Sequence, residues 1–149
     1  MIMRMMRILG AITLVSVGVV HLQQYVGAGY NELPTIGPLF LLNAIGAAVV
    51  ALGLLLPLER LLPERLGNLA VCALALAGVA IAGAALVALF VSESQPLFGF
   101  EEYGYNTAIK IAIATEAATV VLLAPVVVTK LRLAARARVP RSPGALGSP

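Results

Sequence analysis

The stretch NLAVCALALAGVAIAGAALVALFVS, residues 68–92, decides the fold because it contains no charged side chain. About 20 mainly apolar residues in a helix are enough to cross the hydrocarbon layer of a bilayer. A run of this length and composition is typical of a membrane-spanning helix. The sequence therefore predicts that residues 68–92 span a membrane.

Three more segments, on either side of this run in the sequence, are also long and apolar enough to span a membrane. Residues 36–56 precede it, residues 106–128 follow it, and residues 6–26 lie near the N-terminus. Turn-forming residues mark the breaks between the four segments: Gly27, Gly29, Pro34, Pro57, Pro63 and Pro96. We expect a transmembrane domain over residues 1–129 and a disordered basic tail, containing Pro, Gly and Ser, over residues 130–149.

The first span has a second interpretation. Residues 1–20 also resemble a signal peptide, and Val26-Gly27-Ala28 has the small residues of a cleavage site. However, the apolar face continues through His21 and Leu22 to the end of a full span. This continuation favours retention of the first helix.

The composition of the whole chain agrees with membrane insertion. Of its 149 residues, 60% are hydrophobic and 11% charged, and the mean hydropathy is +0.99. Soluble domains are about 45–50% apolar and about 25% charged, and a chain this small cannot hide so much apolar surface in a core. A soluble globular protein and a disordered one are both excluded. The expected fold class is an all-α integral membrane four-helix bundle with short loops.

Residue counts exclude several kinds of site. The chain has one cysteine, one histidine and no aspartate. A single thiol, Cys72, cannot form a disulfide or a cysteine-based zinc site within one chain. A single imidazole, His21, cannot form a two-histidine metal or haem site, and a Ser-His-Asp triad is impossible. We expect no metal and no cofactor.

Basic residues lie on one side of the expected spans. Nine of the ten Lys and Arg residues flank the spans on the side of the two termini: Arg4, Arg7, Arg60, Arg65, Lys130, Arg132, Arg136, Arg138 and Arg141. An excess of Lys and Arg marks the cytoplasmic side of a membrane protein. The sequence thus predicts a multi-pass protein of the inner or plasma membrane with both termini in the cytoplasm.

The basic stretch after the fourth span predicts contact with lipid. Anionic headgroups attract each such charge by about 1 kcal/mol, so we expect lipid-headgroup contacts from Lys130, Arg132, Arg136 and Arg138. No aromatic residues are interleaved with these charges, so we expect no nucleic-acid partner. The expected partners are the bilayer, anionic lipids, and a second copy of the chain or a larger membrane complex.

Aromatic residues gather at the opposite, outer side of the expected bundle. These aromatic residues have two interpretations. They form either a one-sided interfacial belt, with the segment 98–105 lying flat on the membrane, or a lid over an outward-facing pocket. The belt is the simpler interpretation. The candidate lid residues are Phe98, Phe100, Tyr103 and Tyr105.

Glu116 lies about 15 Å into the fourth span, counted from Asn106 at about 1.5 Å per residue. An ionisable residue at this depth is costly and usually functional. It shares a helical face with Ala112 and Thr119, which predicts that it points into the bundle. Lys110 lies six residues away, so its side chain diverges by about 120° and a direct ion pair is not expected.

The same depth count places other polar residues near Glu116. We expect His21 and Asn43 to line one polar cavity with it, and Lys110 to lie at its rim. Tyr25 shares a helical face with His21, and Ser16 reaches roughly the depth of Glu116. The carboxyl is then either protonated or hydrogen-bonded to Asn43, Ser16 or His21. The simpler alternative is a set of interhelical hydrogen bonds, each worth about 0.6 kcal/mol. A ligand or proton site is the second alternative.

Small residues crowd the third span. Ala80, Ala84 and Ala88 form a stripe at four-residue spacing, which lets another helix approach closely. We expect this helix either to be central in the bundle or to mediate self-association.

Three short motifs carry a family resemblance. They are His21-Leu22-x-x-Tyr25, the run PTIGPLFLLN at residues 34–43, and LFGFE at residues 97–101. In these motifs the chain resembles a group of small four-span bacterial membrane proteins, and its size and span count are similar to those of the DoxX-like proteins. The resemblance covers about thirty residues of the outer half, implies a site there, and transfers no chemistry.

Three classes of function stay open. The preferred one is a non-enzymatic accessory or self-associating bundle with an outward-facing polar and aromatic pocket. The second is a proton-coupled carrier built on Glu116 and His21, which with four spans would need a dimer. The third is a membrane enzyme that binds quinone or lipid, since a lone His and Glu could serve acid–base chemistry.

Overall fold

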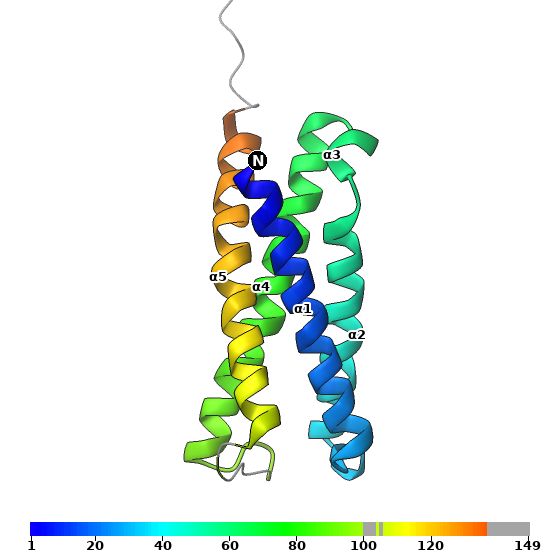
Figure 1. The fold of residues 1–149 in the computed structure, drawn as a ribbon, viewed down its shortest axis with the longest axis vertical. Coiled ribbons are helices and arrows are strands. Elements are labelled where there is room, and N and C mark those ends of the chain that lie inside the picture. The colour runs from blue at the N-terminus through cyan, green and yellow to red at the C-terminus, as the bar shows by residue number, and fades with distance from the viewer. Residues whose placement is uncertain (100–103, 105, 137–149) are drawn as a thin grey trace, which may run out of the picture.

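The structure, a computed structural model, describes residues 1–99, 104 and 106–136, with side chains in the last range up to Ala135. Its regular elements are helices (Figure 1): α1 (Ile2–Gly27), η1 (Tyr30–Glu32), α2 (Ile36–Leu55), α3 (Leu58–Leu61), α4 (Glu64–Ser94) and α5 (Thr107–Arg136). Four of them, α1, α2, α4 and α5, are long and apolar enough to cross a membrane. The prediction of a helical chain with four long apolar segments is confirmed for this part of the chain.

The four long helices follow the predicted spans and differ from them at their ends. α1 begins at Ile2 and α4 at Glu64, both earlier than expected. α5 continues past residue 128 to Arg136, through the first part of the segment expected to be a tail. Leu, Lys, Arg and Ala are good helix formers, so nothing in residues 130–136 ends the helix. Residues 137–149 lie outside the described residues.

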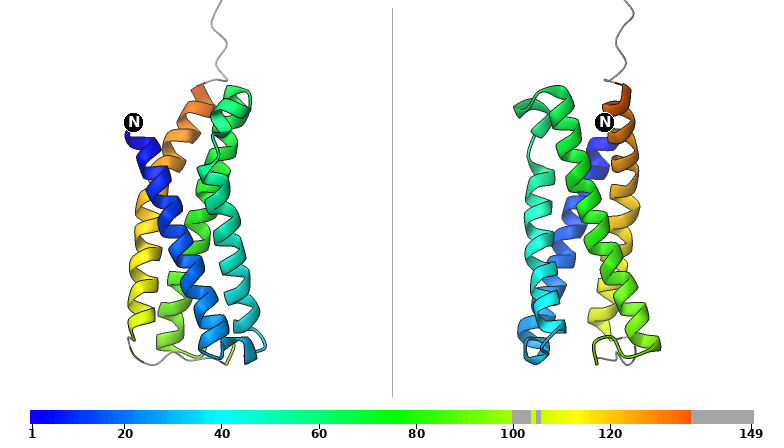
Figure 2. Two further views of the ribbon diagram at one scale, coloured as in Figure 1. Left: turned by 45° about the vertical axis from the view of Figure 1, so that its right-hand side comes forward. Right: turned by 180° about the vertical axis from the view of Figure 1, so that it is seen from behind.

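The four long helices form a ring in the order α1, α2, α4, α5. α1 packs along α2 and α5, α4 packs along α5 and less extensively on α2, and α1 hardly meets α4. The N-terminus, α3 and the last turns of α5 lie together at one end of the bundle (Figures 1 and 2). We call this the α3 end. The opposite end, which carries η1 and the start of α5, is the η1 end.

A compact apolar core fills the half of the bundle towards the α3 end. Its fully buried side chains come from all four long helices: Leu14, Val17, Leu54, Val71, Leu123 and Val126. Gly18 lets α1 approach α2 closely, because a Cβ there would lie 3.2 Å from both the Ala44 carbonyl oxygen and the Ala47 Cβ. Tight packing of small and branched residues therefore fixes the α1–α2 pair.

The outer faces of the long helices are apolar. Large exposed side chains lie along each of them, including Ile12, Val19, Leu42, Val49, Leu76, Val87 and Val121. Contiguous apolar surface of this extent is unusual for a soluble monomer. A lipid environment would satisfy it.

The small-residue stripe of α4 does not make that helix central. α4 occupies one corner of the ring, and Ala80 and Ala84 are exposed on its surface. The expectation of a central third helix is wrong, because α4 buries its Val71–Ala75–Gly78–Ala82 face instead. Self-association through the stripe stays a prediction.

α3 is a short helix that was not predicted from the sequence. It folds back onto the start of α4, where Gly67 makes the contact possible. A Cβ at Gly67 would lie 2.8 Å from Glu59 Cα and 2.9 Å from the Leu58 carbonyl oxygen, too close for any other residue without a shift of the backbone. Gly67 therefore sets the position of Glu59.

Candidate functional site

A cavity of about 320 Å³ lies in the half of the bundle towards the η1 end, and all four long helices line it. Its volume is near the lower end of the roughly 300–1,000 Å³ typical of small-molecule sites. Its lining is largely apolar and includes Val20, Ile36, Leu39, Phe40, Ala84, Ala88, Leu89, Leu97, Ala112 and the polar residues His21, Gln24, Tyr30, Asn43, Ser92 and Glu116. We call it the η1-end cavity.

His21 reaches this cavity from α1 in a fixed orientation. Its side chain is buried, and Nδ1 lies 3.0 Å from the Val17 carbonyl oxygen one turn earlier. A carbonyl oxygen can only accept a hydrogen bond, so Nδ1 carries the hydrogen and Nε2 points into the cavity. The ring also contacts Phe40, at 4.9 Å between centroids, and Phe40 stacks on Tyr30 at 4.8 Å.

Glu116 enters the cavity from α5 and faces His21. It is 2% exposed, which agrees with the inward direction that its helical face predicts. Its Oε1 lies 3.7 Å from His21 Nε2, longer than the roughly 2.7–3.2 Å of a hydrogen bond. Its Oε2 is buried and has no hydrogen-bond partner among the described residues.

The pair has unused capacity to accept hydrogen bonds. With its hydrogen on Nδ1, His21 presents Nε2 as an acceptor, and Glu116 Oε1 lies 3.7 Å from it without a hydrogen bond between them. A hydrogen-bond donor is the chemical group that complements these two atoms.

Asn43 adds a third polar group from α2. Its Oδ1 is buried without a hydrogen-bond partner among the described residues, and the residue lines the same cavity as His21 and Glu116. Ser92 also lines it, but its hydroxyl donates to the Leu89 carbonyl oxygen at 2.8 Å, so it is already satisfied. Buried polar groups without partners are uncommon, and here two of them belong to residues that line one cavity.

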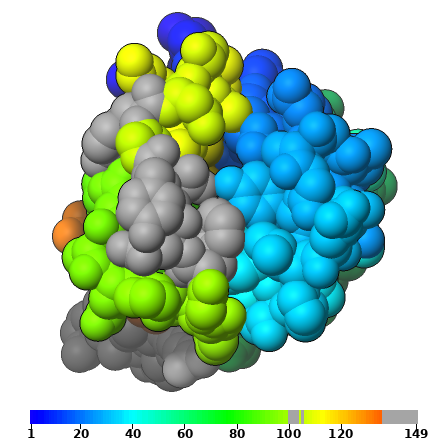
Figure 3. All heavy atoms as spheres, turned by 90° about the horizontal axis from the view of Figure 1, so that it is seen from below, coloured from blue at the N-terminus to red at the C-terminus, as the bar shows by residue number. Residues whose placement is uncertain are grey.

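The cavity lies where α2 and α4 move apart. The two helices are close at Gly53 and Leu74, and again at Gly46 and Ile81. Beyond those contacts, towards the η1 end, they diverge (Figure 2). The cavity is lined by the diverging stretches of both helices, and Ala84 there is exposed. Viewed from the η1 end, α1 and α2 form one side of the surface and α4 and α5 another (Figure 3).

Three of the expected cavity residues are not brought into it. The hydroxyl of Ser16 donates to the Ile12 carbonyl oxygen of its own helix, at 3.3 Å. Lys110 is exposed, and neither it nor Tyr25 lines the cavity. Among the expected lid residues, Phe98 is 66% exposed, whereas its neighbour Leu97 lines the cavity. Phe100, Tyr103 and Tyr105 lie outside the described residues.

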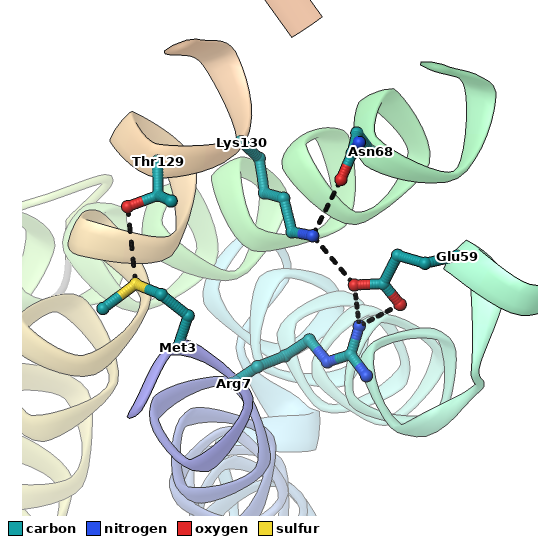
Figure 4. Close-up of polar contacts among 6 residues, drawn as sticks. All are labelled: Met3, Arg7, Glu59, Asn68, Thr129 and Lys130. Atoms are coloured by element: carbon teal, nitrogen blue, oxygen red, sulfur yellow. Dashed lines mark hydrogen bonds and ion pairs between the residues drawn. The ribbon is translucent and has the colours of Figure 1, made fainter. Parts of the chain in front are cut away.

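A second polar cluster lies at the α3 end and was not expected from the sequence (Figure 4). Glu59 on α3 accepts from Arg7 Nη1 at 2.8 and 2.7 Å and from Lys130 Nζ at 2.9 Å. Lys130 also donates to Asn68 Oδ1 at 2.8 Å. We call these four residues, Arg7, Glu59, Asn68 and Lys130, the Glu59 network. It joins α1, α3, α4 and α5.

The two cations determine the charge of Glu59. Partial burial alone would raise the pKa of its carboxyl, but the hydrogen bonds from Lys130 and Arg7 outweigh burial and lower the pKa from 4.5 to about 2. Glu59 is therefore ionised at neutral pH. The signal in the sequence is an acidic residue inside a basic connection, next to Arg60.

The residues expected to contact lipid headgroups divide into three groups. Lys130 directs its ammonium into the Glu59 network, and only 14% of its side chain is exposed. Arg132 is exposed at the α3 end. The side chain of Arg136 and the whole of Arg138 lie outside what the structure describes, so their lipid contacts stay predictions.

In the described ranges, no group of three or more His, Cys, Asp or Glu side chains could hold a metal ion. Cys72 is buried, with Sγ 3.8 Å from the Val127 carbonyl oxygen. No family model matches the sequence, and neither a curated protein nor a solved structure matches it.

Proposed function

We propose that this chain is a multi-pass protein of the inner or plasma membrane with both termini in the cytoplasm. The four long apolar helices support insertion. Orientation is supported by charge: Arg4, Arg60 and Arg65 belong to the α3 end, while in the described ranges the η1 end carries Glu32 and one basic residue, Lys110. Lys and Arg collect on the cytoplasmic side. The η1-end cavity then belongs to the outer half of the membrane.

Accessibility labelling tests this orientation. Single cysteines introduced at Arg60 and Gly99, in a Cys72→Ala background, should react from opposite sides of sealed vesicles. In vesicles that keep the orientation of the cell membrane, a membrane-impermeant maleimide should label the Gly99 site from outside. It should label the Arg60 site only after the membrane is opened. Labelling of both sites from outside would refute the orientation.

We further propose that the protein binds a small lipophilic molecule bearing a hydroxyl or similar hydrogen-bond donor in the η1-end cavity, and that it acts as a binding bundle and not as an enzyme. One observation carries this proposal. Glu116 and Asn43, each with a buried oxygen that has no partner among the described residues, line one largely apolar cavity together with His21. An apolar pocket with a few convergent polar groups is the usual design of a small-molecule site.

The proton-coupled carrier receives less support. A carrier needs a path to both sides of the membrane, and the core between Glu116 and the α3 end is filled by Leu14, Val17 and Leu123, all 0% exposed. A dimer interface would have to supply the path. A lipid-facing route between α2 and α4 fits a molecule that arrives from the bilayer and leaves the same way.

Farnesol and its methyl ether are a matched pair of probes for this cavity, since only farnesol has a hydroxyl hydrogen. Native mass spectrometry of the protein in mild detergent should show one saturable farnesol site and much weaker retention of the ether. Equal retention of the two probes would refute the donor requirement. Retention of neither would refute the proposed function.

A pair of variants on one helix face tests the location. Ala84 lines the cavity, and Ala80, one turn away on the same face, does not. Both are exposed, so leucine at either position should be tolerated. Ala84→Leu should abolish farnesol retention by filling the cavity, whereas Ala80→Leu should keep it. Equal effects would place binding elsewhere.

A further inference from the structure

A second cavity, of about 440 Å³, opens beside the Glu59 network at the α3 end. Four cationic residues line it, Arg4, Arg7, Arg60 and Lys130, and one anionic residue, Glu59. With one negative charge against four positive ones, three positive charges are uncompensated. We call it the α3-end cavity. It is separate from the η1-end cavity, and no residue lines both.

Hydrogen-bond donors remain available in this cavity. Arg7 uses only Nη1 for Glu59 (Figure 4), and its Nε is buried without a partner among the described residues. Lys130 uses two of its three N–H groups. Arg4 and Arg60 are exposed and form no ion pair within the described ranges. An anion that enters would therefore meet the exposed guanidinium groups of Arg4 and Arg60, whereas Arg7 Nε is buried and would need a side-chain movement to donate.

The Glu59 network holds part of this site in place before any ligand arrives. Only 9% of the Arg7 side chain and 14% of the Lys130 side chain are exposed, and both are fixed against Glu59. Side chains that are already ordered lose little entropy when they bind a ligand. The carboxylate thus orients two cations without neutralising the cavity.

The rest of the lining is apolar. It consists of Met3, Ile8, Leu55, Pro57 and Val126. Arginine and lysine are the usual ligands of phosphate groups, while an apolar wall suits the glycerol and first acyl carbons of a lipid. Basic pockets between transmembrane helices on the cytoplasmic side are typical headgroup sites.

We propose that the α3-end cavity binds the phosphate group of an anionic ligand, with Arg4 and Arg60 supplying its free charges and Arg7 and Lys130 its fixed ones. Two sources share this chemistry, a phospholipid headgroup and free phosphate. The apolar wall favours the lipid.

The test uses the full chain in a mild nonionic detergent. Three probes are titrated: dioctanoyl phosphatidylglycerol, dioctanoyl phosphatidylcholine and inorganic phosphate. Apparent Kd values come from the saturable rise of the melting temperature and from native mass spectrometry. The pocket variant is Arg4→Gln/Arg60→Gln. The matched control is Arg65→Gln/Arg132→Gln, which removes the same charge from exposed positions at the same end that do not line the cavity.

The wild type should bind phosphatidylglycerol saturably and more tightly than phosphatidylcholine. The pocket variant should bind it about 30-fold more weakly, from about 1 kcal/mol for each lost charge. The control should change Kd less than about threefold at physiological ionic strength, since salt screens exposed charges that do not line the cavity. No saturable response to inorganic phosphate identifies the lipid as the source. A saturable response that the pocket variant loses identifies free phosphate.

Two results would overturn the proposal. Equal weakening in the pocket and control variants would mean that diffuse surface charge, and not this cavity, attracts the anion. Equal affinity of the wild type for both lipids, with no response to inorganic phosphate, would mean that the cavity does not select an anionic ligand. Melting temperatures without ligand show whether each variant is folded, and both Arg4 and Arg60 are exposed and outside every ion pair within the described ranges.

Discussion

Replacing Glu59 with glutamine should destabilise the bundle more than the same change at Glu64. The substitution keeps the size of the side chain and removes its charge. It leaves Arg7, 7% exposed, and Lys130 without their shared counter-ion. A buried cation that loses its partner keeps its desolvation cost and loses the compensating attraction.

The size of the effect follows from the pKa of Glu59. A shift from 4.5 to about 2 corresponds to at most about 3.4 kcal/mol. The side chain is 32% exposed, so solvent screens part of this attraction. We expect Glu59→Gln to lower the free energy of unfolding by about 1–2 kcal/mol at neutral pH.

The pH dependence has a definite sign. Because the pKa is lower in the folded protein, the stabilisation is present above about pH 4.5 and is lost as the pH falls towards 2. Unfolding by sodium dodecyl sulfate, followed by circular dichroism at a series of pH values, measures it. The difference between wild type and Glu59→Gln should be constant from pH 7 to about 5 and shrink below that.

Glu64→Gln is the matched control. Glu64 is exposed in the first turn of α4, and its substitution should cost no more than about 0.5 kcal/mol through the helix dipole. If Glu59→Gln and Glu64→Gln behave alike, the Glu59 network does not stabilise the fold. A wild-type difference that grows as the pH falls below 4 would refute the assigned sign.

Three further predictions concern packing and polar contacts inside the bundle. Gly67→Ala should cost about 1–2 kcal/mol in the same titration, because its Cβ would meet α3 backbone at 2.8 Å, whereas Gly83→Ala, with open space around it, should be neutral or stabilising. Thr119→Val should cost about 0.6 kcal/mol by removing the 2.9 Å hydrogen bond to α1, and no change at all would show that this contact is not formed. Glu116→Gln should stay within about 1 kcal/mol of the wild type, since an amide of the same shape can donate to His21; a loss of several kcal/mol would indicate an ionised carboxylate paired with a protonated imidazole.

The features that follow from helix geometry were predictable. Length and hydropathy gave the four helices, and counting along α5 gave the burial of Glu116. Depth counting alone also brought His21 and Asn43 to the same level, where the structure has them line one cavity. Ser16 failed because a serine can satisfy its hydroxyl on its own helix, so depth does not decide its direction.

The Glu59 network was not predictable in the same way. Its members lie 52 and 71 positions apart in sequence, and helix periodicity carries no information about which side chains meet across the bundle. It depends on α3, a helix of one turn, and on the close approach allowed by Gly67. Lys130 was assigned to the expected basic tail, although α5 continues through it.

The packed apolar core lies between the η1-end cavity and the α3-end cavity and separates them. Leu14, Val17 and Leu123, all 0% exposed, fill the core between the two cavities. Any effect of occupancy at one site on affinity at the other must therefore travel as a displacement of α1, α2 or α5, the helices that line both. Thermodynamic linkage makes such an effect reciprocal. If a lipophilic ligand in the η1-end cavity raises the affinity of the α3-end cavity for an anion, the anion raises the affinity for the lipophilic ligand by the same factor.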